Sequence, residues 1–289
     1  MKNQKSLYRR AFTLIFSLSL LLSTAQAQPA PQKSAQDEST EPFRIAYNLY
    51  YVGSREIGSY LVVTPEGDIL INCTNSVEQL QTSIEKLGFK ITDVKILLLS
   101  NSREEIAGGC NVLFDLTHAK LMVMDGDVEA VESRNLKVDR ILHDRDFVQL
   151  GGFELLAYKT AGFTPGATTW TMQPMSKGEL RNVIILSGLQ VEPGIHLVNL
   201  PHHPAAYKGI AEDYEKSFLL LRQSPEAIFL SAYSRDFNLI TKVEKFRLNG
   251  DEDIWFDPKG FKDCLAERRR AFRKILKSQE SLLPPVQNY

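Results

Sequence analysis

Residues 94–99 (VKILLL) limit the fold more than any other segment. They are apolar apart from Lys95, and there are too few of them for a buried helix, so they predict a strand that is buried on both faces. Such strands occur where helices cover the sheet. Residues 227–232 form a second run of this kind. A sheet covered by helices is therefore the first expectation.

Further short strands are predicted in two groups. Aromatic and branched residues at 43–52, 60–63 and 68–71 indicate a meander, with a turn at Pro65-Glu66-Gly67. The second group comprises residues 147–150, 153–158, 168–172 and 182–186, with Gly151-Gly152 between its first two strands.

Helices are predicted after each group of strands. Ser76 and Gln79 are spaced as a capping box, residues 77–87 keep helical spacing, and Gly88 ends the segment. Residues 210–221 and 261–276 predict two more helices. Two groups of strands, each followed by helices, predict an α/β (α+β) chain with two β-sheets face to face and helices outside.

The chain begins with a segment typical of a cleavable signal peptide. Lys2, Lys5, Arg9 and Arg10 precede an apolar run at 11–22, and Ala25-Gln26-Ala27 predicts cleavage after Ala27. The run is too short for a permanent membrane helix, so we expect no membrane insertion and a periplasmic or secreted protein. Residues 28–42 predict a disordered arm, residues 43–280 one domain and residues 281–289 a tail.

Charge and cysteine content narrow the function further. The 34 Lys and Arg residues balance 35 Asp and Glu residues, which does not favour a nucleic-acid partner. Cys73, Cys110 and Cys264 permit at most one intramolecular disulfide, and the sequence does not say which. Three small buried thiols are an equally acceptable interpretation.

The mature chain resembles the metallo-β-lactamase superfamily, and within it the third β-lactamase subclass. The resemblance rests on segments that occur in order along nearly the whole domain: NLYYVG at 48–53, VTPEG at 63–67, IN at 71–72, SIEKLGF at 83–89, GFTPGATTWTM at 162–172, GIAEDY at 209–214 and FDP at 256–258. It implies a four-layer αββα sandwich with a dinuclear zinc site in loops at one edge.

The resemblance also implies six zinc-ligand positions, and none of them holds histidine here. A His-x-His-x-Asp-His motif is replaced by Asn101, Arg103, Glu105 and Ile106. Phe163 and Tyr233 stand where the family has its other two histidines. Of the six, only Glu105 is a good ligand, while Arg103 is a permanent cation that repels a metal. We therefore expect no zinc cofactor and no metal-bound hydroxide.

Three interpretations of this altered pocket remain open. The first is a structural plug in which Arg103 pairs with Glu105 or Glu104. The second is a pseudoenzyme that binds a small molecule through Ser102, Arg103, Glu104, Phe163 and Tyr233, with Asn101 orienting it. The third is a divergent hydrolase of a cyclic amide or ester, with one metal on Glu105 and Tyr233 or with acid–base chemistry on Glu104 and Glu105.

Three other features carry less weight. The five histidines, which lie outside the mapped ligand positions, are His118, His143, His196, His202 and His203. The basic helix at 261–276 has an apolar face for packing, so its charges predict a solvated side. Cys110 follows Gly108-Gly109 at a predicted helix start, where a buried structural thiol is a better interpretation than a reactive one.

Overall fold

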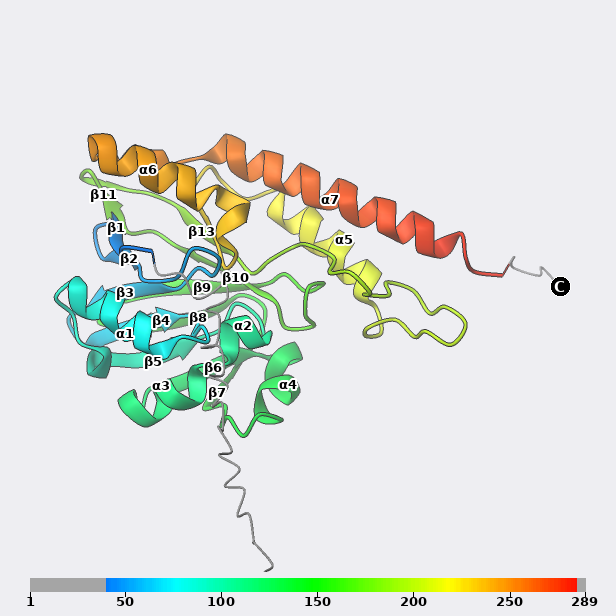
Figure 1. Cartoon of the computed structure of the whole chain (residues 1–289), viewed down its shortest axis with the longest axis horizontal. Coiled ribbons are helices and arrows are strands. Elements are labelled where there is room, and N and C mark those ends of the chain that lie inside the picture. Colours follow the sequence, from blue (N-terminus) through cyan, green and yellow to red (C-terminus); the bar gives the residue numbers. More distant parts are fainter. Residues whose placement is uncertain (1–39, 285–289) are drawn as a thin grey trace, which may run out of the picture. The chain divides into compact units, whose positions relative to one another are not determined.

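Two β-sheets packed face to face form the centre of the computed structural model, which describes residues 40–284 (Figure 1). The strands of the seven-stranded sheet follow chain order: β1 (Phe43–Ala46), β2 (Leu49–Tyr51), β3 (Tyr60–Thr64), β4 (Gly67–Ile71), β5 (Val94–Leu98), β6 (Lys120–Met124) and β7 (Arg140–Leu142). The order in the five-stranded sheet is β14 (Ile228–Ser231), β13 (Val183–Leu186), β10 (Thr168–Met172), β9 (Phe153–Lys159) and β8 (Asp146–Leu150). A small hairpin pairs β11 (Met175–Ser176) with β12 (Glu179–Leu180).

Helices cover the outer face of each sheet. The first sheet packs against α1 (Val77–Lys86), α2 (Glu104–Ala107), α3 (Cys110–Thr117) and α4 (Val128–Glu132). The second packs against α5 (Ile210–Leu221), α6 (Leu239–Asn249) and α7 (Pro258–Glu280). The expected four-layer αββα sandwich is thus confirmed.

The alternation of side chains on the buried strands explains the layers. On β4, Ile69 and Ile71 face the core between the sheets, whereas Leu70 faces the helices of the first outer layer. The strand β5 pairs in parallel with both β4 and β6. A parallel strand of this kind is apolar on both faces because both faces are covered, as residues 94–99 predicted.

Several predicted elements differ in detail. Residues 43–52 form two strands rather than one, because the chain turns at Tyr47-Asn48 between β1 and β2. The predicted capping box is wrong, since the Ser76 side chain makes no hydrogen bond to the start of α1. The C-terminal helix is longer than 261–276, because Pro258 at its first turn and the side chain of Asp257, which accepts from the Gly260 amide, begin it earlier.

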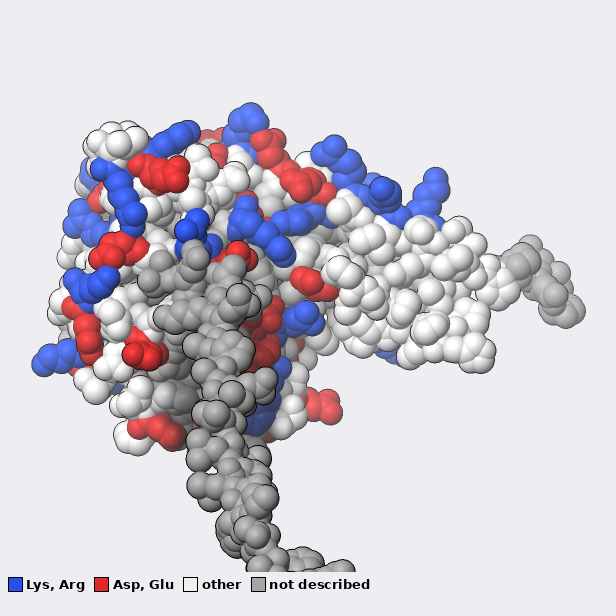
Figure 2. All heavy atoms as spheres, viewed as in Figure 1, with Lys and Arg blue, Asp and Glu red and all other residues white. Residues whose placement is uncertain are grey.

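The predicted signal peptide at 1–27 and most of the predicted arm lie outside the described residues. Thr40 is buried and Glu41 pairs with Lys86 at 2.8 Å, so the end of the predicted arm lies against the domain. Within 40–284, no helix is both long and apolar enough to cross a membrane. Most basic side chains of α7 are exposed, as the sequence predicted, and blue atoms follow this helix in Figure 2, whereas Arg268 and Arg269 are partly buried in ion pairs with Asp236 and Glu215.

Candidate functional site

The loop after β5, which carries most of the altered ligand positions, is held by hydrogen bonds from both sheets. The Ser100 amide donates to Oδ1 of Asn72 at 2.9 Å, and the Ser100 carbonyl accepts from the Thr168 amide at 2.7 Å. Asn101 is buried, and its Nδ2 donates to the carbonyl of Ser187 at 2.7 Å. The loop is thereby fixed at the edge where the two sheets meet.

Asp127 joins this loop to the loop that carries Phe163. Its carboxylate accepts hydrogen bonds from the Ser102 amide at 2.8 Å, the Thr164 hydroxyl at 2.7 Å and the Gly166 amide at 2.8 Å. Burial raises the pKa of Asp127, and the three donors oppose that rise. Asp127 was not among the predicted site residues, yet it positions two of the loops that form the site.

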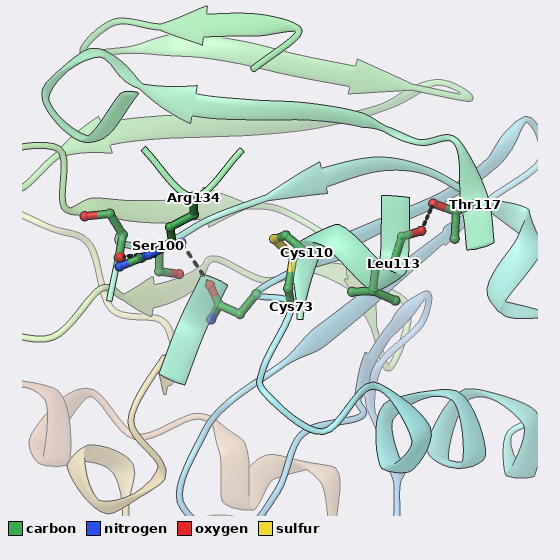
Figure 3. Close-up of a disulfide and its surroundings, with 8 residues drawn as sticks. Cys73, Ser100, Cys110, Leu113, Thr117 and Arg134 are labelled. Carbon is green, nitrogen blue, oxygen red and sulfur yellow. Dashed lines mark hydrogen bonds between the residues drawn. A yellow bond between two sulfur atoms is a disulfide. The ribbon is translucent and has the colours of Figure 1, made fainter. Parts of the chain in front are cut away.

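A disulfide lies beside the loop that follows β5 (Figure 3). Cys73 and Cys110 are bonded with their Cα atoms 5.2 Å apart, which resolves the pairing that the sequence left open. The amides of Cys73 and Thr74 donate to the Ile106 carbonyl at 2.9 and 3.1 Å. Cys110 is therefore a structural residue that anchors α3 beside α2, and Cys264 is a buried free thiol.

Four side chains from three segments meet at the centre of the site. The Tyr233 hydroxyl donates to Oε1 of Glu105 at 2.9 Å, and the same oxygen lies 3.9 Å from Nε of Arg103. The Arg103 guanidinium stacks over the Phe163 ring at 5.3 Å from its centroid. The rings of Phe163 and Tyr233 meet edge to face at 5.5 Å. We call these four residues the Tyr233 cluster.

Tyr233 is a neutral hydroxyl in this setting. Its ring packs against Gly188, where a Cβ atom would lie 2.7 Å from the ring and where φ is +114°. Burial, followed by the nearby Glu105 carboxylate, raises the pKa of Tyr233 far above its usual value. The protonated hydroxyl therefore donates a hydrogen bond to Glu105.

The remaining predicted site residues have other partners. Ile106 is fully buried in the apolar cluster between the first sheet and its helices. Glu104 pairs with Arg134 at 3.4 Å. Of the two predicted partners of Arg103, the structure therefore shows Glu105. The amide of Ser102 donates to Asp127 at 2.8 Å, and its carbonyl accepts from Arg134 at 2.6 Å. Ser102 and Glu104 therefore both help to hold the loop in place.

The donor set does not fit zinc. A zinc site needs imidazole, thiolate or carboxylate groups that converge with little competing positive charge. Here one carboxylate, Glu105, already serves a phenol hydroxyl and a guanidinium, and an alkyl and a phenyl side chain stand at two other positions. Among residues 40–284, no three His, Cys, Asp or Glu side chains are placed together as a metal site would require.

The histidines lie elsewhere. The rings of His196 and His203 stack at 5.1 Å in the segment between β13 and α5. His118 ends α3 in a left-handed conformation with φ 52°, and His143 lies 3.8 Å from Asp146. None of them belongs to the Tyr233 cluster.

Solved structures with the same architecture are metallo-β-lactamases. The native metallo-β-lactamase FEZ-1 from Legionella gormanii is 38% identical, with 84% of this chain and 98% of that chain covered and a TM-score of 0.79. The subclass B3 metallo-β-lactamase BJP-1 of Bradyrhizobium japonicum is 27% identical, with coverage of 86% and 98% and a TM-score of 0.80. The class B3 di-zinc metallo-β-lactamase LRA-12 from an Alaskan soil metagenome is 26% identical, with coverage of 86% and 99% and a TM-score of 0.76. No protein-family model matches the chain.

Proposed function

Since this chain belongs to the metallo-β-lactamase family, we propose that it is a metal-independent member, a pseudoenzyme whose altered zinc pocket binds a small anionic molecule. The observation that carries the proposal is the Tyr233 cluster, in which a guanidinium, a carboxylate, a phenol and a phenyl ring stand at four of the six ligand positions. The Glu105 carboxylate lies between the Tyr233 hydroxyl, at 2.9 Å, and the Arg103 guanidinium, at 3.9 Å, which supports a site that needs no ion.

The loss of zinc-dependent hydrolysis is supported by the chemistry of these groups. Arg103 keeps its charge at all physiological pH values, and a divalent ion beside it would be repelled. Glu105 is the one side chain among the six that ligates zinc well, and it is committed to Tyr233 and Arg103. A single metal on Glu105 and Tyr233 would first require a phenolate, which burial strongly opposes.

Ligand binding is supported by the exposure of Arg103. Its side chain is 39% exposed, and the ion pair with Glu105 is long at 3.9 Å, so the guanidinium can still accept a second anion. The Phe163 ring beneath it holds the guanidinium plane in place. A carboxylate that approaches Arg103 from solvent would meet a preorganised cation next to an aromatic surface.

An extracytoplasmic setting is part of the proposal. The predicted signal peptide and the Cys73–Cys110 disulfide agree with an oxidising compartment.

The test combines zinc content, turnover and binding on one sample. The chain from residue 28 is dialysed against zinc and then against buffer, and we expect substoichiometric zinc by mass spectrometry and no colour change with nitrocefin, a carboxylate-bearing β-lactam. Bound zinc with zinc-dependent turnover would instead favour a divergent hydrolase.

The same nitrocefin sample tests the pocket by thermal denaturation. At a concentration roughly a hundredfold above Kd, binding to the native state should raise Tm by about 5 to 10 °C. Arg103→Ala should abolish that rise, whereas Arg270→Ala, an exposed arginine on α7, should keep it. An equal rise in wild type and Arg103→Ala would refute a role for Arg103.

A further inference from the structure

Two adjoining cavities lie at the outer layer of the second sheet, and neither is lined by a residue of the Tyr233 cluster. The smaller cavity, about 480 Å³, lies between the C-terminal end of α5 and the first three turns of α7. The larger, about 670 Å³, lies over the outer face of β8, β9, β10 and β13. Both are lined by Leu221, Ser224 and Pro225, so they adjoin at these residues.

The smaller cavity has an apolar floor. Phe218 and Leu221 line it from α5, and Phe261 and Leu265 line it from α7. Each of these side chains is at most 5% exposed, so together they form a fixed apolar surface beneath an open space. Its volume lies within the range of roughly 300 to 1,000 Å³ that is usual for small-molecule sites.

The rim of the smaller cavity carries an excess of positive charge. Its cations are Arg222, Lys262 and Arg269, and its one acidic residue, Glu226, pairs with Lys262 at 3.5 Å. Arg269 donates through Nη2 to Glu215, while its Nε atom is buried and has no hydrogen-bond partner. Arg222 is exposed and has no ion-pair partner among the described residues.

We propose that this cavity binds a single-chain fatty carboxylate. The carboxylate would lie between Arg222 and Lys262, where charge-assisted hydrogen bonds are available, and the alkyl chain would cover the apolar floor. The site is independent of the altered zinc pocket, so it remains even if that pocket binds nothing.

Calorimetric titration of the chain from residue 28 with sodium dodecanoate, below its micelle concentration, tests the proposal. Each methylene buried adds about fourfold in affinity, so octanoate should bind at least tenfold more weakly than dodecanoate. Dodecyltrimethylammonium has the same chain with the opposite charge and should show no saturable binding. A short-chain diacyl phosphatidylglycerol tests whether the source of the anion is a lipid headgroup, and its two chains should fit poorly.

Two kinds of variant locate the site. Ala266→Trp fills the cavity from an exposed position on α7 and should abolish binding, whereas Ala271→Trp, on the same helix but outside this cavity, should not. The double variant R222Q/K262Q should weaken dodecanoate binding about tenfold without removing the floor. Arg103→Ala should leave it unchanged.

The proposal is overturned if wild type does not bind dodecanoate, if Ala266→Trp binds it as wild type does, or if the ammonium amphiphile binds equally well. Binding of phosphatidylglycerol in preference to dodecanoate would also overturn it, because the ligand would then be a membrane lipid. Circular dichroism and Tm of both tryptophan variants must match wild type, and if Ala266→Trp is unfolded the charge variants decide the matter.

Discussion

The hydroxyl of Tyr233 donates a 2.9 Å hydrogen bond to Oε1 of Glu105, an oxygen that also lies 3.9 Å from Nε of Arg103. One carboxylate oxygen thus connects a loop after β14 to the loop after β5, across 128 positions of sequence. The connection between these loops in this protein is a network of side chains.

Removal of the phenol hydroxyl should weaken this connection. Tyr233→Phe leaves the ring packed against Phe163 but removes a donor from a carboxylate that is only 24% exposed. We expect the free energy of unfolding in urea to fall by about 1 to 2 kcal/mol. Tyr47→Phe is the control, because Tyr47 is 68% exposed, and it should change stability by less than about 0.5 kcal/mol. Equal stability of Tyr233→Phe and wild type would show that the bond is energetically unimportant.

The buried carboxyl of Asp68 on β4 should make stability depend on pH. Burial, and to a smaller extent the nearby Asp93 carboxylate, raises the pKa of Asp68 to about 6. Between its unfolded pKa and about 6 the folded state therefore binds more protons than the unfolded state. By linkage, this group's contribution to stability is present at pH 4 and is lost as pH rises through about 6.

Asp68→Asn should remove that dependence. The variant keeps the shape of the side chain and lacks the charge, so its stability relative to wild type should increase between pH 4 and pH 7, by up to about 3 kcal/mol. Urea denaturation at several pH values measures this difference, with the exposed Asp115→Asn as the control. A difference that is constant over this pH range would exclude Asp68 as the titrating group.

The strand pattern could be predicted because burial on both faces leaves a clear apolar signature at 94–99 and 227–232. The turn at Tyr47-Asn48 lacks glycine and proline, so its one local signal was Asn48, a single turn-forming residue among aromatic and branched ones. The helix α6 was missed although left-handed residues at Asn238 and Gly250 bound it, because charged residues interrupt its apolar spacing.

The candidate site shows the same limit. The altered ligand positions could be identified one by one from the sequence. Which side chains pair depends on contacts between distant loops, so the sequence could not distinguish Glu105 from Glu104 as the partner of Arg103. Asp127 did have a sequence signal. It follows the apolar strand β6, which is parallel to β5, and the carboxyl ends of parallel neighbours share one edge of the sheet.

The disulfide should contribute much of the stability of the site region. It closes a segment of 37 residues, and the loss of that constraint in the unfolded chain corresponds to about 3 to 4 kcal/mol. The variant C73A/C110A should show this loss in urea denaturation.

Thiol titration of the wild type should detect no reactive thiol in the native state and one after unfolding, because burial raises the pKa of Cys264 to about 12. A reactive thiol in the native protein would contradict the assignment.

A single restored ligand should not recover zinc binding. Ile106 is fully buried among apolar side chains, so Ile106→His places an imidazole where it has neither water nor an assured partner. We expect a loss of about 2 to 4 kcal/mol in unfolding free energy, similar to that of Ile106→Ala, which only leaves a cavity. Added zinc should not raise Tm in either variant, because Arg103, Phe163 and Tyr233 still occupy three other ligand positions. A metal held by the introduced imidazole and Glu105 alone would also be repelled by the Arg103 guanidinium. A zinc-dependent rise of several degrees in Ile106→His, and none in Ile106→Ala, would mean that the neighbouring groups can rearrange around a metal, and the metal-independent function would have to be abandoned.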